Sequence, residues 1–310
     1  MITGFQAASG CQVALRPWSG AADAPGPLRG MLGTLDLVSV RADRVRALVG
    51  AHLLVPVDNG AIDGIDGAGS RLRSQPAIAF GGATYAVPYA WEPLLLLSRD
   101  DAFPDGPPTG LRALWEPRRS AQVAVPDDPL TLATAALSVG VDDPFDLDLS
   151  DLAAADELVR LAAPAYRWRG DASLERLLAS GQVSLALGPP RIARDLQGRV
   201  DVSVTMPVEG AVGVARVLAI PVRAPHPVCA YRFLSYVLEP QAQAAVALAT
   251  GLTPVVRTAC RALGTRQCTR LHANDQWSPR VQLAHRPVAP AAPWARWVAG
   301  WRASRRERSN

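Results

Sequence analysis

The feature that most constrains the fold is an alternation of short apolar runs with longer stretches of helical spacing. Five runs have the length and composition of strands: residues 12–15, 35–40, 122–125, 182–187 and 200–205. Apolar residues recur at helical intervals over residues 43–50, 130–139, 149–162 and 172–179, and again over 226–238 and 240–250. Strands and helices in alternation predict α/β layers with a mainly parallel sheet.

Local signals predict where helices begin and where loops lie. Asp128 precedes the helix at 130–139, and Ser150 or Asp151 is the expected cap of the helix at 149–162. Pro240 stands where a first helical residue is expected. The Gly- and Pro-rich stretches 58–70 and 102–109 predict surface loops.

Length and charge set the broad class of the protein. A chain of 310 residues is long enough for two lobes of ordinary domain size, and 49% apolar with 19% charged residues is a globular balance. The net charge is only +4, and part of it comes from the terminal run Arg302, Arg305, Arg306 and Arg308. Such a run is typical of a solvated end, so we expect no nucleic-acid partner.

Enzymatic chemistry has little support in the residues. All 32 basic residues are arginine, which excludes a Schiff-base lysine, a lysine general base and a P-loop lysine. The four histidines lack metal-site spacing, and neither a G-x-S-x-G elbow nor a Walker A motif is present. An enzyme would have to use Asp127 and Asp128. The sequence predicts a non-enzymatic protein without a metal or cofactor.

The cysteines leave two interpretations open. None of Cys11, Cys229, Cys260 and Cys268 forms a C-x-x-C motif or has zinc-ligand spacing. Cys260 and Cys268 are close enough to close a short disulfide loop, and free thiols are equally compatible with the pattern. No run of 18 apolar residues predicts a membrane span, and Met1 is not followed by the basic flank and apolar stretch of a signal peptide.

A series of short segments carries a family resemblance. No single segment is specific, but all of them follow one another in the same order and at the same spacing as in that family. They are LDLVS at 35–39, AVPYAW at 86–91, LWEP at 114–117, GQV at 181–183, PVEGA at 207–211, LAIP at 218–221, FLSYVLEP at 233–240 and GLTP at 251–254. Trp294 and Trp297 fit a closing helix. In this order the segments resemble the spermidine/putrescine-binding proteins of ABC importers over about residues 5–300.

The resemblance implies a two-lobed periplasmic-binding-protein fold (type II, Venus flytrap) with a ligand cleft. Lobe one is expected to comprise residues 1–92 and 216–260, lobe two residues 93–215, and residues 261–310 form C-terminal helices that pack on lobe two. Ligand binding closes the lobes by hinge motion and presents the closed form to a membrane permease. The resemblance further implies a monomer that is periplasmic, or extracellular and membrane-associated.

The candidate ligand-binding residues depart from the family's pattern. In the family, aromatic rings of the cleft flank the methylene chain of a polyamine and carboxylates hold its ammonium ends, an arrangement that suits a dication. This chain has Arg41 and Asp43 where the family has Ser-x-Tyr, and Thr131 replaces a carboxylate near Asp128. Pro189 replaces a tryptophan, and Val214 and Arg216 replace Trp-x-Asp. The candidate set is Arg41, Asp43, Trp91, Asp127, Asp128, Arg191, Glu209 and Arg216.

Three arginines in a cleft favour a different ligand class. Arg41, Arg191 and Arg216 would repel a polyamine and suit a carboxylate or phosphonate held bidentately, so we predict an anionic or zwitterionic small ligand. The alternative is that these arginines lie outside the cleft or pair with Asp43, Asp127 and Glu209 as structural salt bridges.

The start of the chain departs from the family as well. It opens at what resembles the first helix, with Phe5 and Gly10 before the segment at Cys11, so the given sequence is expected to lack the family's first strand. Either the start at Met1 is assigned too late, or the protein has lost that strand. A missing strand would expose a sheet edge or leave a core gap. The rival functions are a degenerate or truncated paralogue without a transport ligand, and a ligand-sensing or enzymatic protein on the same scaffold.

Overall fold

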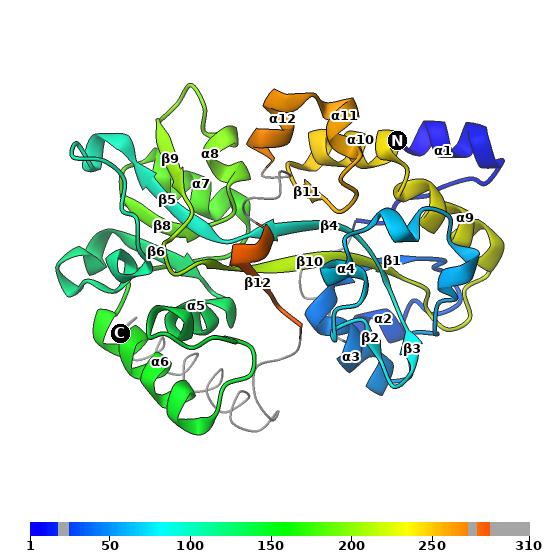
Figure 1. Cartoon of the computed structure of the whole chain (residues 1–310), viewed down its shortest axis with the longest axis horizontal. Helices are drawn as coiled ribbons and strands as arrows, with labels where there is room; N and C mark the ends of the chain where they lie inside the picture. Colours follow the sequence, from blue (N-terminus) through cyan, green and yellow to red (C-terminus); the bar gives the residue numbers. More distant parts are fainter. Residues whose placement is uncertain (18–24, 272–277, 286–310) are drawn as a thin grey trace. The chain divides into compact units, whose positions relative to one another are not determined.

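The computed structural model describes residues 1–17, 25–271 and 278–285, and it divides into two α/β units (Figure 1). Of the described residues, unit 1 comprises 1–17, 25–92, 214–271, Ser278 and 284–285. Unit 2 comprises Pro93–Gly213 and Pro279–Leu283. The chain therefore passes from one unit to the other after Glu92 and returns after Gly213, two residues before the expected return.

Unit 1 is built on a mixed sheet. Its strand order is β1 (Val38–Arg41), β10 (Ala211–Ala219), β4 (Val87–Pro93) and β11 (Thr253–Pro254). The first three residues of β10 belong to unit 2, as does β12 (Val281–Leu283), with which they pair. The β1–β10 and β4–β11 pairs are antiparallel, whereas β10 and β12 are parallel. A short hairpin, β2 (Ala79–Phe80) and β3 (Ala83–Thr84), stands apart from this sheet.

Helices of unit 1 come from both ends of the described chain. They are α1 (Ile2–Ser9), α2 (Pro25–Arg29), α3 (Ala42–Gly50), α4 (Ser70–Arg73), α9 (Pro227–Val237), α10 (Pro240–Thr250), α11 (Ala259–Leu263) and α12 (Thr265–Arg270). The prediction that residues from 261 onward pack on lobe two is wrong for residues 261–271. Leu263 and Leu271 share a buried apolar cluster with Ala244 and Ala247 of α10, and this burial holds α11 and α12 in unit 1. Trp294 and Trp297 lie outside the described residues.

Unit 2 contains a second mixed sheet in the order β7 (Tyr166–Trp168), β6 (Val123–Pro126), β8 (Leu185–Gly188), β5 (Leu95–Arg99) and β9 (Val202–Thr205). Strands β7, β6 and β8 are parallel, and β5 runs antiparallel to both of its neighbours. The expectation of a mainly parallel sheet is therefore wrong, because β5 and the long β10 enter their sheets in the opposite direction.

The helices of unit 2 are α5 (Leu130–Ser138), α6 (Leu149–Ala162), α7 (Asp171–Ala179) and α8 (Arg191–Asp195), and α5 and α6 pack side by side (Figure 1). The N-cap of α5 is Pro129, so the predicted cap Asp128 lies one residue too early, and its side chain accepts a hydrogen bond from the amide of Leu130 at 3.0 Å. For α6 the predicted cap, Ser150 or Asp151, is wrong by two or three residues, because the N-cap is Asp148. Asp148 accepts from the amides of Ser150 and Asp151, and Asp151 completes a capping box at the third helical position.

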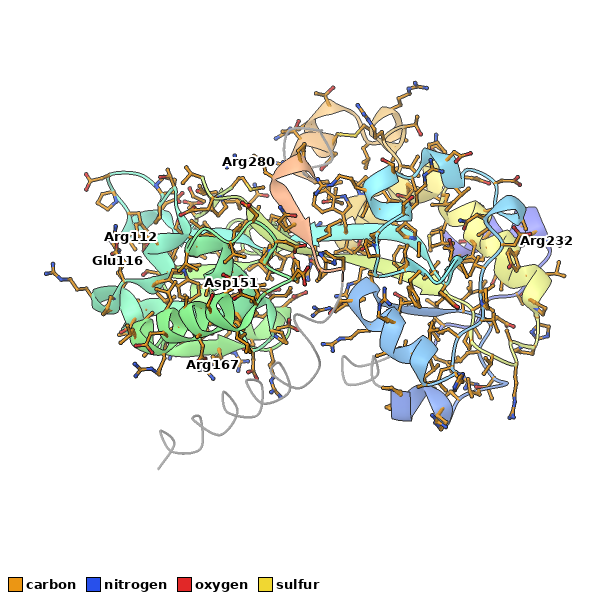
Figure 2. All side chains as sticks on the ribbon, turned by 60° about the horizontal axis from the view of Figure 1, so that its bottom comes forward. Arg112, Glu116, Asp151, Arg167, Arg232 and Arg280 are labelled. Atoms are coloured by element: carbon orange, nitrogen blue, oxygen red, sulfur yellow. A yellow bond between two sulfur atoms is a disulfide. The ribbon has the colours of Figure 1, made fainter. Side chains whose placement is uncertain are left out.

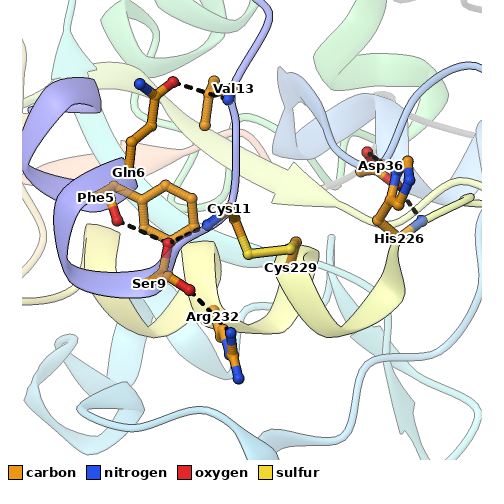
Figure 3. Close-up of a disulfide and its surroundings, with 9 residues drawn as sticks. All are labelled: Phe5, Gln6, Ser9, Cys11, Val13, Asp36, His226, Cys229 and Arg232. Atoms are coloured by element: carbon orange, nitrogen blue, oxygen red, sulfur yellow. Dashed lines mark hydrogen bonds and ion pairs between the residues drawn. A yellow bond between two sulfur atoms is a disulfide. The ribbon is translucent and has the colours of Figure 1, made fainter.

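Both pairs of cysteines form disulfides. Cys260 and Cys268 close the short loop that the sequence left open, and Cys11 bonds to Cys229 across 218 residues. Residues 12–15, expected to be a strand, belong to no strand, and the amide of Val13 bonds to Oε1 of Gln6 in α1 (Figure 3). Within the ranges that the structure describes, no helix is both long and apolar enough to cross a bilayer.

Candidate ligand-binding site

Two of the predicted arginines face each other on neighbouring strands of unit 1. Along β1, Val38 and Val40 are buried, so the alternating residues Ser39 and Arg41 lie on the other face of the sheet. The register pairs Arg41 directly with Arg216 of β10. Directly opposed residues of an antiparallel pair project to the same face with Cβ atoms about 5 Å apart. The fold thus places the Cβ atoms of Arg41 and Arg216 next to each other on one face of the sheet.

Each of these guanidinium groups has a carboxylate partner. Arg41 donates from Nε to Oδ1 of Asp43 at 2.9 Å and from Nη2 to Oδ2 at 3.1 Å, which is a bidentate fork. Arg216 Nη2 lies 3.6 Å from Oε1 of Glu92, the last residue of unit 1 before the chain crosses. Burial alone would raise the pKa of Asp43, but the charges of Arg41 and Arg44 outweigh it, and the pKa of this carboxyl lies below its ordinary value.

Hydroxyl groups lie beside this charged cluster. Ser39, on the same face of β1 as Arg41, shares a hydrogen bond of 2.8 Å with the hydroxyl of Tyr89 in β4. Trp91, another predicted site residue, is 5% exposed and stands opposite Thr253 of β11. The indole of Trp91 is therefore mainly part of the packing of unit 1.

The acidic pair of unit 2 is held by local contacts. Asp127 follows β6, its amide donates to the carbonyl of Trp168, and its carboxylate pairs with Arg169. Asp128 bonds to the start of α5, as described above. Arg169 was not among the predicted residues, although it follows the strand-like residues 166–168.

Arg191 and Glu209 occupy separate places in unit 2. Arg191 opens α8 and pairs with Asp171 at the start of α7. Both carboxylate oxygens of Glu209 accept from the amide of Leu111, at 3.1 and 3.0 Å. Arg280, one of the side chains labelled in Figure 2, donates to the carbonyls of Pro207 and Val208, beside Glu209 in the chain.

The structure therefore brings together part of the predicted set. Arg41, Asp43 and Arg216 lie in one cluster of unit 1, to which the structure adds Ser39, Tyr89 and Glu92; we call these six residues the arginine cluster. Of the structural pairings considered as an alternative, that of Arg41 with Asp43 is present, whereas Asp127 pairs with Arg169 and Glu209 binds a backbone amide. Glu92 could have been found from the WEP sequence at the crossing point. In the described part of the chain, no three metal-ligating side chains are grouped.

Comparisons with known proteins agree with this architecture. A family model described as bacterial extracellular solute-binding protein matches residues 1–265. The spermidine/putrescine ABC transporter substrate-binding protein PotD from Streptococcus pneumoniae is similar with a TM-score of 0.82 and 16% identity, over 96% of this chain and 92% of that one. The Tp0655 (TpPotD) lipoprotein of Treponema pallidum gives 0.79 and 19%, over 97% and 94%.

A third similar structure was determined in complex with an acid. The binding protein AgtB from A. tumefaciens R10, in complex with agropinic acid, has a TM-score of 0.71 and 20% identity, over 99% of this chain and 91% of that one. Identities this low show a shared fold. The fold is the mixed α/β fold of periplasmic binding proteins that the sequence predicted.

Proposed function

The chain belongs to the bacterial extracellular solute-binding proteins, the non-enzymatic substrate-binding components of ABC transporters, and we propose that its ligand is a small anionic or zwitterionic molecule rather than a polyamine. Membership in this family implies two kinds of partner, a small-molecule ligand and a membrane permease. The finer question is which chemistry the ligand carries, and the side chains of this chain bear on it.

The observation that carries the proposal is the pair of guanidinium groups at Arg41 and Arg216. Arg41 and Arg216 are directly paired in the register of β1 and β10, and the Arg216 side chain is 34% exposed. A dication placed here would meet two like charges. A carboxylate or phosphonate would instead receive charge-assisted hydrogen bonds from two planar forks, the arrangement that guanidinium provides best.

The similar structures include proteins for both kinds of ligand, so they are compatible with an acid as well as with a polyamine as the ligand of this chain. The Streptococcus pneumoniae protein is a spermidine/putrescine-binding component, whereas AgtB was solved with agropinic acid. One fold thus serves both ligand chemistries, and fold alone does not choose between them. The arginines at positions 41 and 216 support the acid.

We also propose that the protein works outside the cytoplasm. All four cysteines are paired in disulfides, Cys11 with Cys229 and Cys260 with Cys268. Disulfides of this kind persist in oxidising compartments such as the periplasm or the cell exterior. This agrees with the extracellular family to which the chain belongs.

A thermal-shift screen tests the ligand class. The purified protein is scanned with amino acids, dicarboxylates, phosphonates, inorganic anions, spermidine and putrescine. A ligand of the native state at a hundred times its dissociation constant stabilises by about 2.7 kcal/mol, so a true ligand gives a clear shift. We expect an acid-bearing compound to raise Tm in the wild type and to lose this effect in Arg41→Ala and Arg216→Ala.

The ligand-induced shift is the quantity to compare, because truncating Arg41 also lowers the stability of the free protein. Arg261→Ala, an exposed arginine on α11 of the same unit, is the matched control and should keep the shift. Stabilisation by spermidine or putrescine, without any by acids, would contradict the proposal and return the protein to polyamine binding.

A further inference from the structure

A stretch of unit 1 carries basic residues and no acidic ones. Residues 240–271 contain neither aspartate nor glutamate, and their basic residues, all exposed, are Arg257, Arg261, Arg266 and Arg270. Arg160, an exposed arginine of unit 2, has Glu157 one helical turn away and pairs with it at 2.6 Å. Residues 240–271 offer no such carboxylate of their own, so this segment concentrates positive charge.

The arginines of α11 lie opposite the buried side of this helix. Ala259 and Leu263 are buried in the apolar cluster that they share with α10. Arg261 is two residues from each of them, which is about 200° around a helix, so its side chain projects away from α10. The turn before α11 extends this outer side, because the amide of Cys260 donates to the carbonyl of Arg257 at 3.1 Å and Arg257 precedes Arg261 by four residues.

Helix α12 has the same arrangement and is joined to α11. Cys268 is buried, and Arg266 and Arg270 stand two residues before and after it, so both project from the opposite, exposed side. The disulfide between Cys260 and Cys268, whose Cα atoms are 5.3 Å apart, holds the two helices together, and they lie next to each other in Figure 1. We call their outer side the basic face, defined by Arg257, Arg261, Arg266 and Arg270.

The remaining exposed residues of this segment indicate what kind of partner the basic face fits. They are small or carry a hydroxyl group: Thr258, Ala262, Gly264, Thr265 and Thr269. Residues 257–271 expose no large apolar side chain. Interfaces between proteins are centred on aromatic or large apolar anchors, which this face lacks. A plane of lipid phosphates needs no such anchor, because arginine forks bind phosphate oxygens bidentately and a cluster of four cations is attracted to an anionic membrane.

We propose that the basic face binds the anionic phospholipid headgroups of a membrane surface. The chain belongs to a family of extracellular solute-binding proteins that serve transporters embedded in a membrane. A contact of α11 and α12 with lipid concentrates the protein at the bilayer where its transporter lies. The arginine cluster is built on β1, β4 and β10 and the start of α3, so the membrane contact and the ligand use different elements.

Cosedimentation of the purified full chain with lipid vesicles tests this proposal. Vesicles of phosphatidylcholine alone are compared with an equal mixture of phosphatidylcholine and phosphatidylglycerol. We expect binding to the mixture at about 50 mM salt and loss of most of it at about 500 mM, because salt screens the attraction. Each arginine near an anionic surface changes the partition coefficient about fivefold, so replacing all four arginines of the basic face with glutamine should weaken binding at least about tenfold.

A matched control removes the same charge from another part of the chain. Four arginines of unit 2 that pair with carboxylates are replaced in one variant, which carries Arg119→Gln, Arg160→Gln, Arg194→Gln and Arg199→Gln. Its net charge equals that of the basic-face variant, and it should bind the mixed vesicles like the wild type. Both variants should keep the Tm shift with an acid-bearing ligand, so failure of the membrane proposal and failure of the ligand proposal are distinguishable.

The other outcomes overturn the proposal in recognisable ways. Equal binding to neutral and mixed vesicles, or no binding to either at low salt, would show that anionic headgroups are not the partner. Equal weakening in both four-arginine variants would assign the attraction to net charge and not to the basic face. Binding only to native membrane vesicles, abolished when their proteins are digested, would assign the face to a membrane protein instead of lipid.

Discussion

At the scale of single residues, the repulsion between Arg41 and Arg216 is opposed by the attraction of each arginine to a carboxylate. Directly opposed like charges on neighbouring strands destabilise a sheet. Arg41 and Arg216 occupy such positions, and Asp43 and Glu92, both largely buried, offset the repulsion. A buried carboxylate of this kind stabilises the native state only while it is ionised. Asp43 should therefore govern part of the response of unit 1 to acid.

Asp43→Asn tests this balance. The pKa of Asp43 is lower in the folded chain than in the unfolded one, so its contribution is fully present above the ordinary aspartate range and is lost as pH falls through the folded pKa. We expect Asp43→Asn to lower the free energy of unfolding by about 3 kcal/mol at pH 7. The difference from wild type should shrink below about pH 4.

Urea unfolding at pH 7, 5 and 3 measures this difference. Asp63→Asn, an exposed carboxylate of unit 1, should stay close to the wild type at every pH. A difference for Asp43→Asn that is the same at pH 3 as at pH 7 would show that the charge of Asp43 does not stabilise the fold.

Sequence reasoning found some members of the cluster and missed others for a physical reason. Arg41, Asp43 and Arg216 stood out because they interrupt a motif at strand ends. The directly opposed positions of Arg41 and Arg216 depend on the β1–β10 register, which joins residues about 175 apart, and a residue pattern does not carry such a register. Glu209 was chosen from a motif, and its oxygens are in fact directed at the amide of Leu111.

At the scale of elements, helix α1 is joined to α9 by both packing and a covalent bond. Phe5 is 2% exposed, and its ring lies 5.0 Å from that of Phe233 and 5.4 Å from that of Tyr236. Arg232 donates to the carbonyl of Ser9 at 3.0 Å (Figure 3). The Cys11–Cys229 disulfide adds a link between positions 218 residues apart, so it restrains the unfolded chain strongly.

The two disulfides should differ in their effect on stability. Chain entropy predicts that the loop of 218 residues contributes about 3 kcal/mol more than the loop of 8 residues closed by Cys260 and Cys268. The double variant Cys11→Ser/Cys229→Ser should therefore lose much more stability than Cys260→Ser/Cys268→Ser. Urea midpoints of the two variants and the wild type measure this, and equal losses would contradict the entropic account.

Helices were more predictable from the sequence than strands. Apolar spacing placed α3, α5, α6, α7, α9 and α10 within a few residues, because a helix is fixed by contacts along its own chain. Residues 12–15 have the composition of a strand and yet pair with no strand in the structure, because a strand needs a neighbour. The directions of β5 and β10 were missed for the same reason, since pairing direction is a property of two distant segments.

At the scale of the whole molecule, the chain belongs to a family of solute-binding proteins. We propose that the arginines of its cluster determine which solute it binds. The fold is shared with polyamine-binding components at 16 to 19% identity. At such identity the sheets and cores persist while side chains at a site change freely. The ligand that we propose for this chain carries an acidic group, and the proposal depends on the arginine cluster.

The most direct measurement is the identity of the small molecule that the native protein carries. The full chain is purified without denaturation from cells grown in rich medium, unfolded, and the released compounds are identified by mass spectrometry, with Arg216→Gln and Arg261→Gln prepared in parallel. The account predicts a compound with a carboxylate or phosphonate, recovered from the wild type and Arg261→Gln and depleted from Arg216→Gln. Spermidine or putrescine, recovered equally from all three proteins, would contradict it.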